Sequence, residues 1–417
     1  MVLLGLAIGP AAPAGANSPG VDPKSPAATD GHADLSVDAS LSLAEAVRIA
    51  ASREPGRLVV EARGVEAEAF RRDAGRWLSD VPSLVGAHVT DAVGSDHGYR
   101  QWDAALELPL WWPGQRAPRR AKADAAGAAA GQAAEAHRLE VAGRVRAAVA
   151  ALDLTRNRLE LARSELDAEE ALAARVARAV ELGELAERDR LLALSASLER
   201  RTRYLEALEE HRHAQADYTL LTGLDRRPAR WGETLAQETD LERHPELILA
   251  RTDVAVARAE VERLERARWS GPVVAIGSQH ERDDRGNDYS HRLVAGIRIP
   301  LGRRDAVSSG LAGAQRRLAE ARRTAGRLAI DLEGRRMRAE HALSLVADRI
   351  ETDRQRARMA DDHLQLTERG FALGEVDLAT LVRARARAID AQQSLREAEI
   401  LQRMRIAQYN QALGVVP

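Results

Sequence analysis

Apolar residues recur at seven-residue steps in two long, proline-free segments of the chain, one after Pro118 and one after Leu301. A stripe with this period is typical of a helix that packs along its length against a partner helix. At 1.5 Å per residue, a helix over 119–182 would be about 90 Å long. The stripe residues are Val145, Leu152, Leu159, Leu166, Ala173 and Val180 in the first segment, and Leu343, Ile350, Ala357, Leu364 and Phe371 in the second.

A partner helix is predicted to follow each segment directly, after a Leu-Gly-Glu turn. Gly183 and Gly374 can adopt the left-handed conformation that ends a helix, so the chain can reverse there. The sequence therefore predicts two long helical hairpins, at about 119–222 and 307–413. Apolar heptads continue beyond the two turns at Leu191, Leu198, Leu205, Val382 and Ile389.

Two other segments alternate apolar and polar residues with a period of two, which is typical of a strand with one face in an apolar environment. These segments are 102–112 and 293–301, and weaker candidate strands precede them at 83–90 and 273–280. Polar loops that contain glycine join the members of each pair. We therefore expect β-hairpins at about 83–112 and 273–301.

Turn-forming residues recur at a nearly constant spacing along the chain. Pro300 follows Pro109 by 191 residues, and Gly414 follows Gly223 by the same number. Because Gly and Pro fix turns that a fold cannot easily shift, this spacing indicates two copies of one unit. The predicted organisation is a first repeat at 41–223, a connector at 224–243 and a second repeat at 244–417.

Composition agrees with a mainly helical protein. Charged residues make up 30% of the 417 residues and aromatic residues only 3%, as in long helices and coiled coils. The net charge of −2 gives no indication of nucleic-acid binding. The chain has no cysteine, which excludes disulfides and thiolate metal sites.

The N-terminal residues have the pattern of a secretion signal. A short apolar run precedes Ala14-Gly15-Ala16, a small-x-small cleavage pattern. We predict a signal peptide at 1–16, with a disordered Ala/Pro tail as the alternative. The following residues, 17–40, are rich in Pro, Gly, Ser and Asp and predict a flexible linker.

Aromatic residues gather in and beside the predicted strands, as they do at the two interfaces of transmembrane barrels. We assign Trp102, Trp111 and Trp112 to the membrane interface. Four strands cannot close a barrel, for which about eight is the practical minimum, and an open edge is costly in lipid. Several chains must then share one barrel, unless the strands form small sheets that merely cap the helices.

The polar faces of the predicted strands carry charges that would line a barrel lumen. These residues are Asp103, Glu107, Arg292 and Arg298. His280 and His291 could approach each other across the second hairpin, as could His88 and His97 in the first, but solvated loop or lumen histidines are the favoured interpretation. We predict no catalytic residues, no metal site and no cofactor.

The order of these segments resembles the TolC-like outer-membrane efflux proteins over residues 41 to 414. The resemblance rests on "LSLAEAVRIA", "ALELPLWWPGQR" and "ELGELAERDRLLA", followed by "AGIRIPLGRRD", "ALGEVDLATLVRARA" and "YNQALG". The strand ends "ELPLWWPGQR" and "RIPLG" are most similar to the heavy-metal, CzcC-like branch. The resemblance implies a homotrimer with a twelve-stranded barrel in the outer membrane and an α-helical barrel in the periplasm.

Partners and tip residues also follow from the resemblance. The helical tips would dock on a periplasmic adaptor linked to an inner-membrane pump of the RND type. Residues near the turns would form the periplasmic entrance, namely Asp189, Asp377, Thr380 and Arg383. The tips themselves would be Leu182, Gly183 and Glu184, with Leu373, Gly374 and Glu375.

The leading functional hypothesis is a passive exit duct that catalyses nothing and conducts substrates expelled by the pump. One alternative is a duct for type I protein secretion, and another is a soluble coiled-coil scaffold.

Overall fold

The computed structural model describes residues 34–237, 240–267, 270–301 and 306–417. Residues Leu35–Pro417 form one compact unit. The predicted signal peptide and most of the predicted linker lie outside the described residues.

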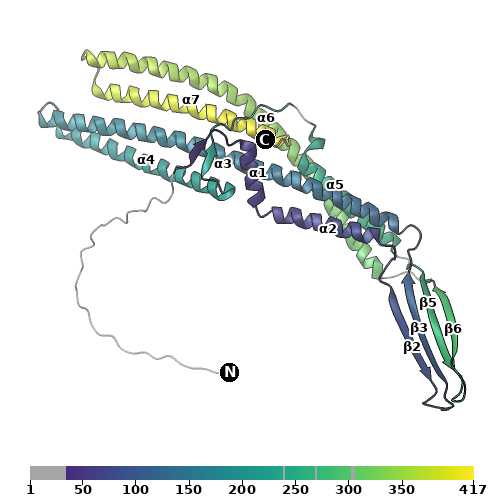
Figure 1. The fold of residues 1–417 in the computed structure, drawn as a ribbon. Helices are drawn as coiled ribbons and strands as arrows, with labels where there is room; N and C mark the ends of the chain where they lie inside the picture. The colour runs from purple at the N-terminus through teal and green to yellow at the C-terminus, as the bar shows by residue number, and fades with distance from the viewer. Residues whose placement is uncertain (1–33, 238–239, 268–269, 302–305) are drawn as a thin grey trace, which may run out of the picture. The chain divides into compact units, whose positions relative to one another are not determined.

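The described unit consists mainly of helices, and a small sheet lies at one end of them (Figure 1). The first half contains β1 (Ser36–Asp38), α1 (Leu43–Arg53), α2 (Arg57–Gly75), β2 (Ser83–Thr90), β3 (Arg100–Pro109), α3 (Arg116–Glu181) and α4 (Glu187–Thr222). The second half contains β4 (Arg226–Pro228), η1 (Leu241–Arg243), α5 (Pro245–Arg266), β5 (Val273–Arg282), β6 (Ser290–Arg298), α6 (Ala306–Ala372) and α7 (Leu378–Ala412). A helix, a β-hairpin, a long helix and a shorter returning helix thus occur in the same order in both halves.

The helices pack as two hairpins that are joined side by side. Helix α3 packs against α4, α6 packs against α7, and α3 also contacts α7. Helices α2 and α5 lie along α3, and α5 also packs against α6. An ion pair between Arg63 and Asp253, at 2.7 Å, links α2 to α5. The predicted helical hairpins are present with these bounds.

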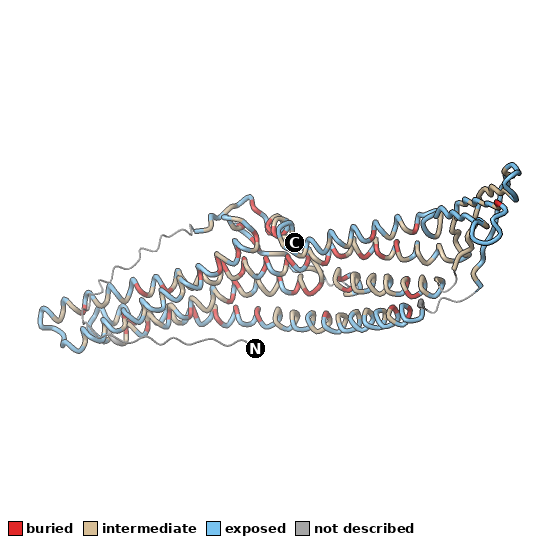
Figure 2. The backbone as a smooth tube through the Cα atoms, turned by 90° about the horizontal axis from the view of Figure 1, so that it is seen from below, coloured by how far each residue is buried: buried red, intermediate tan, exposed pale blue. Residues whose placement is uncertain are grey.

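The largest core cluster lies midway along α3, where α1 and α4 cover it. Buried residues follow the inner helix faces, whereas the helical turns and the β-hairpin loops are exposed (Figure 2). Burial raises the pKa of Tyr218 to about 12, and its hydroxyl donates to the Arg226 carbonyl at 3.1 Å. The cluster includes Leu43, Val47, Val141, Val145, Val149, Leu152, Tyr218 and Trp231.

The four longer strands form one antiparallel sheet in the order β2-β3-β5-β6. Strand β3 pairs with β5, so the two β-hairpins join in the middle of the sheet. Strands β2 and β6 are its two edges.

Several predicted boundaries were wrong. Strand β3 ends at Pro109 rather than at 112, and β6 ends at Arg298 rather than at 301. Proline has no N–H group and cannot donate to the ladder, and regular pairing of β3 with β5 ends at Pro109, although the Leu110 N–H still donates to the Pro272 carbonyl at 2.8 Å. Helix α3 begins at Arg116, because Pro118 falls in the first turn, where a proline is tolerated.

The end of the predicted linker and part of the predicted connector are ordered. Strand β1 pairs in parallel with β4, and Asp38 forms an ion pair with Arg226 at 2.6 Å. Strands of three residues carry no periodic pattern that sequence alone could reveal.

The predicted role of the leucines beyond the first turn was also wrong. Leu191, Leu198 and Leu205 are 57%, 54% and 55% exposed and lie on the face of α4 that is turned away from α3. Their counterparts in α7, Val382 and Ile389, are half-buried and line a groove beside α3.

Candidate functional site

The sheet has one apolar and one polar face. Cross-strand partners point to the same side, so the register assigns each side chain to a face. Large side chains on the apolar face are strongly exposed, with Leu84 at 80% and Leu293 at 82%. Members of this face are Leu84, Trp102, Leu106, Leu108, Val274, Ile276, Leu293 and Ile297. Such an apolar surface requires a non-aqueous or protein partner.

All four residues predicted to line a lumen lie on the polar face. Arg298 crosses over β5 to form an ion pair with Glu107 at 2.7 Å. Arg292 pairs with Glu281 at 2.9 Å, and Asp103 accepts a hydrogen bond from Gln101 at 2.7 Å. The polar face is therefore charged, and its acids and bases are largely paired.

The three tryptophans assigned to a membrane interface occupy different surroundings. Trp102 lies on the apolar face and stacks on His88, with ring centroids 3.8 Å apart. Trp111 and Trp112 follow the end of β3. The indole N–H of Trp111 donates to the Arg76 carbonyl at 3.2 Å, beyond the last residue of α2.

The two Leu-Gly-Glu turns have the same backbone geometry. Gly183 and Gly374 both have φ of +77°, in the left-handed region. The Gly183 N–H donates to the Val180 carbonyl at 3.0 Å, and the Glu184 N–H donates to the Ala179 carbonyl at 2.8 Å. The second turn repeats both bonds, at 3.0 and 2.9 Å. This is the Schellman arrangement, which satisfies the last carbonyls of a helix.

Each turn presents an exposed apolar side chain at the end of its hairpin. Leu182 and Leu373 are both 74% exposed, and Glu184 and Glu375 beside them are exposed. An exposed leucine on a turn is not needed to fold the turn, so both leucines are available to a partner.

The acidic residues predicted at an entrance both cap helices. Asp189 accepts a hydrogen bond from the Ala186 N–H at 3.2 Å at the start of α4. Asp377 accepts from the Thr380 N–H at 2.9 Å at the start of α7. Hydrogen bonds from the Thr380 side chain and backbone lower the pKa of Asp377 below its ordinary value. Arg383 donates to the Thr380 hydroxyl at 3.1 Å, so Asp377, Thr380 and Arg383 form one local cluster.

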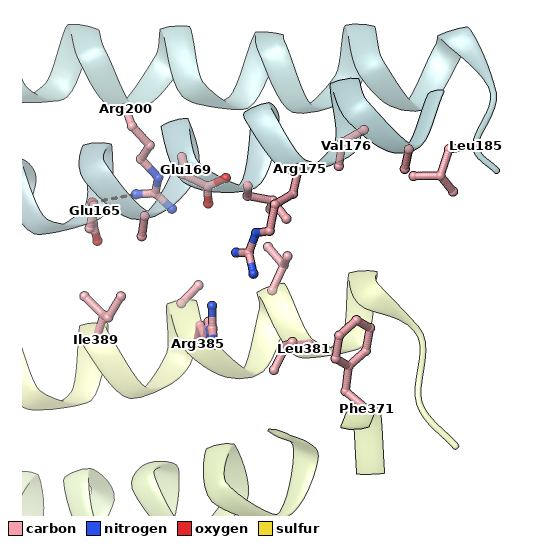
Figure 3. Close-up of a pocket in the computed structure, with 15 residues that line it drawn as sticks. Glu165, Glu169, Arg175, Val176, Leu185, Arg200, Phe371, Leu381, Arg385 and Ile389 are labelled. Atoms are coloured by element: carbon pink, nitrogen blue, oxygen red, sulfur yellow. Dashed lines mark hydrogen bonds and ion pairs between the residues drawn. The ribbon is translucent and has the colours of Figure 1, made fainter. Parts of the chain in front are cut away.

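A groove of about 250 Å³ lies between α3 and α7 near the two turns (Figure 3). Its charged residues are partly paired, because Arg200 bonds Glu165 at 2.8 Å and Arg385 bonds Glu368 at 2.8 Å. Arg175 and Arg385 extend toward each other from the two helices. The apolar lining comes from Leu172, Val176, Leu185, Phe371, Leu381 and Ile389.

No pattern in the sequence indicated this groove directly. Its walls come from two segments far apart in the chain, at 165–200 and 371–389. Heptad spacing says which face of a helix is apolar but not which distant helix covers it. Phe371, Val382 and Ile389 are the lining residues that the periodicity singled out.

No helix within the described ranges is long and apolar enough to cross a membrane.

Comparisons by sequence and by structure give different results. Neither a family model nor a curated protein matches the sequence. Among solved structures, the CmeC outer membrane channel of Campylobacter jejuni has a TM-score of 0.69 at 14% identity, covering 89% of this chain and 85% of that one. The outer membrane protein VceC of Vibrio cholerae has a TM-score of 0.69 at 15% identity, covering 89% and 96%. A membrane protein from Pseudomonas aeruginosa has a TM-score of 0.70 at 17% identity, covering 92% of each chain.

At this level of identity the similarity establishes the fold. The assignment to a heavy-metal branch stays a prediction. The described part of the chain has the fold of outer-membrane channels, as its resemblance to the TolC-like proteins predicted.

Proposed function

We propose that the protein is the outer-membrane exit duct of a tripartite efflux system. Three copies would join their sheets into one twelve-stranded barrel, and their long helices would form a tube in the periplasm. Substrates expelled by an inner-membrane pump would pass through passively. The duct itself performs no chemistry, since a wide water-filled pore discriminates mainly by charge and width.

One observation carries this proposal: a two-faced sheet whose apolar side is exposed and whose edge strands β2 and β6 have no further strand partner among the described residues. In lipid, each unpaired backbone group costs several kcal/mol, so a sheet is stable there only when its edge strands are paired in a closed barrel. Neighbouring copies can supply strands for both edges. The paired charges of Glu107 and Arg298 would then face the water-filled interior.

Adjacent positions on β3 test which face meets lipid. Leu106→Arg places a charge on the apolar face and should cost about 2–4 kcal/mol near the bilayer midplane. The matched control Ala105→Arg places the same charge on the polar face, opposite Gly277, and should be tolerated. Sucrose-gradient fractionation and heat-modifiable gel mobility would report membrane insertion. Equal insertion of both variants, or recovery of the unaltered protein in the soluble fraction, would contradict the duct.

We further propose that the two turns and the groove between α3 and α7 receive the periplasmic adaptor. Leu182 and Leu373 are exposed at the tips, and the groove has an apolar lining with a rim of arginine and glutamate. This combination suits an amphipathic helical segment, which buries apolar anchors and pairs its charges at the rim.

Glycine substitutions in the turns test this docking. The backbone of Gly183 is left-handed, and an added Cβ would meet no atom within 4 Å, so only backbone strain opposes a larger residue. Gly183→Val or Gly374→Val should abolish efflux and leave the trimer intact, because a branched residue strains a left-handed turn by about 1–2 kcal/mol or more. Gly183→Asn and Gly374→Asn, which tolerate this conformation, are the controls and should retain efflux. Loss of the trimer in the valine variants would mean that the turns act in folding rather than in docking.

A further inference from the structure

Three histidines and one tryptophan form a continuous row across the sheet. His88 on β2 is the register partner of Trp102 on β3, Trp102 is the partner of His280 on β5, and His280 is the partner of His291 on β6. The row therefore crosses all four strands on the apolar face. It lies near the loop end of the β-hairpins, because His291 is the second residue of β6.

Two members of this row converge on one point. The Nδ1 atoms of His280 and His291 are in direct contact, and their ring centroids lie 4.6 Å apart at an interplanar angle of 73°. The other ring nitrogen of His280, Nε2, lies 3.3 Å from the Ser278 hydroxyl. When Nε2–H donates to this hydroxyl, Nδ1 keeps its lone pair and directs it toward His291.

The third histidine is arranged differently. The Nδ1 atom of His88 lies 3.0 Å from the Gln101 carbonyl, and its ring stacks on Trp102. Within one chain, Trp102 separates His88 from His280 in the row, so His88 of the same chain cannot join the pair. Within the row, only His280 and His291 present ring nitrogens to a common point.

We propose that His280 and His291 bind a divalent transition-metal ion, such as Zn²⁺, Ni²⁺ or Cu²⁺. Imidazole nitrogen is a preferred ligand for these ions, with metal–nitrogen distances of about 2.0–2.1 Å for zinc. Two rings whose nitrogens already touch need only move apart slightly to admit an ion between them. A hydrogen bond to the second ring nitrogen, as Ser278 supplies, is the usual way in which a metal-binding histidine is oriented.

The site has two protein ligands. Within the described ranges, no group of three or more His, Cys, Asp or Glu residues is arranged to hold a metal. Glu281 and Arg292 neighbour the pair in sequence but point to the polar face, where they pair with each other. Water would therefore complete the coordination, because His291 is exposed and lies at the loop end of β6, beside the polar hairpin loop. This site does not depend on the exit-duct proposal.

Zinc titration of the full-length protein tests the site. The protein would be purified in detergent without a polyhistidine tag, stripped with EDTA and titrated with Zn²⁺ by calorimetry. We expect one ion per chain in the unaltered protein. H280Q and H291Q should each weaken binding by at least about tenfold, since loss of an outer hydrogen-bonding partner alone typically costs 10–100-fold. The matched control H97Q changes an exposed histidine of the first hairpin loop, outside the row, and should bind like the unaltered protein.

Three results would overturn the proposal: no zinc binding by the unaltered protein, equal binding by all four proteins, or loss of binding in only one of H280Q and H291Q. Heat-modifiable mobility of each variant shows that its assembly is intact. If a glutamine variant fails to assemble, alanine at the same position serves as the second variant.

Discussion

The middle of the described unit and its two sides differ in how completely they are packed. We call β3, β5, α3 and α7 the inner elements, because the two halves of the chain meet there. We call β2, β6, α4 and α6 the outer elements. Helix α7 contacts both α6 and α3, and none of its described large apolar side chains is exposed. Helix α4, by contrast, exposes Leu191, Leu198 and Leu205, and α6 exposes Ile330, Met359 and Leu366.

This difference supports the proposal that a single chain is one part of a closed assembly. The inner elements already have neighbours on both sides, whereas the outer elements have a neighbour on one side only. Each half of the chain supplies one open strand and one open helix, β2 and α4 in the first half and β6 and α6 in the second. A neighbouring copy that covers α4 with α6 would also bring β6 beside β2.

The largest effect is expected at Arg146, which links α3 to α7 and to the segment after β4. Arg146 on α3 is 4% exposed and bonds Glu233 at 2.6 Å, Gln411 of α7 at 2.5 Å and the Val415 carbonyl at 3.0 Å. Arg146→Met leaves the largely covered Glu233, which is 11% exposed, without this ion-pair partner, and this should cost about 3–5 kcal/mol.

Thermal unfolding, followed by circular dichroism in detergent, measures this loss. Arg144→Met is the control, because Arg144 is exposed and its pair with Glu54 should contribute no more than about 1 kcal/mol. Similar melting temperatures for the two variants would show that the bonds of Arg146 to Glu233 and to α7 do not stabilise the fold.

A charge on an outer element should disrupt assembly without unfolding the chain. Leu198→Glu places a carboxylate on the exposed apolar stripe of α4. If a second copy covers this stripe, burial of the unpaired charge would cost several kcal/mol and the trimer should dissociate. Native gel mobility compares this variant with Arg201→Glu, which alters an exposed polar position of the same helix. A stable trimer of Leu198→Glu would mean that the stripe faces solvent or a different partner.

A smaller, pH-dependent effect on stability is expected from the ion pairs of Glu260 between α3 and α5. Burial alone would raise the pKa of Glu260, but hydrogen bonds from Arg263 and Lys122 outweigh it and lower the pKa to about 2. A lowered pKa stabilises the fold fully above the ordinary value of 4.5, and this contribution is lost as the pH falls toward 2. Lys122→Met should therefore lower the melting temperature by at most a few degrees at pH 7. The difference in melting temperature between this variant and the unaltered protein should become smaller below pH 4.5. A difference that stays constant with pH would show that protonation of Glu260 is not linked to stability in this way.

Features encoded within one short segment could be predicted from the sequence. Gly183 and Gly374 mark turns because a glycine just after the end of an apolar heptad stripe can take the left-handed conformation that ends a helix. The period-two segments located the strands in the same way. The ends of the strands were misplaced because the alternation of apolar and polar residues continues past Pro109, where the regular strand pairing ends.

Features that depend on contacts between distant segments could not be predicted. The groove beside Arg175 and Arg385 needs α3 and α7 to lie side by side, and β1 pairs with a strand in the other half of the chain. The exposure of Leu198 depends on which face of α4 meets α3. Periodicity within one segment carries no information about such contacts.

The central claim, that outer elements of neighbouring copies complete one another, can be tested by disulfide cross-linking. The chain has no cysteine, so any disulfide that forms must join the two introduced cysteines. Val85→Cys on β2 would be combined in turn with cysteine at 292, 294 or 296 on β6, all on the polar face. Within one chain these positions are three strand spacings apart, about 14 Å, which is too far for a disulfide. Oxidation in the outer membrane should give covalent dimers and trimers for at least one pair, whereas only monomers from all three pairs would contradict the account.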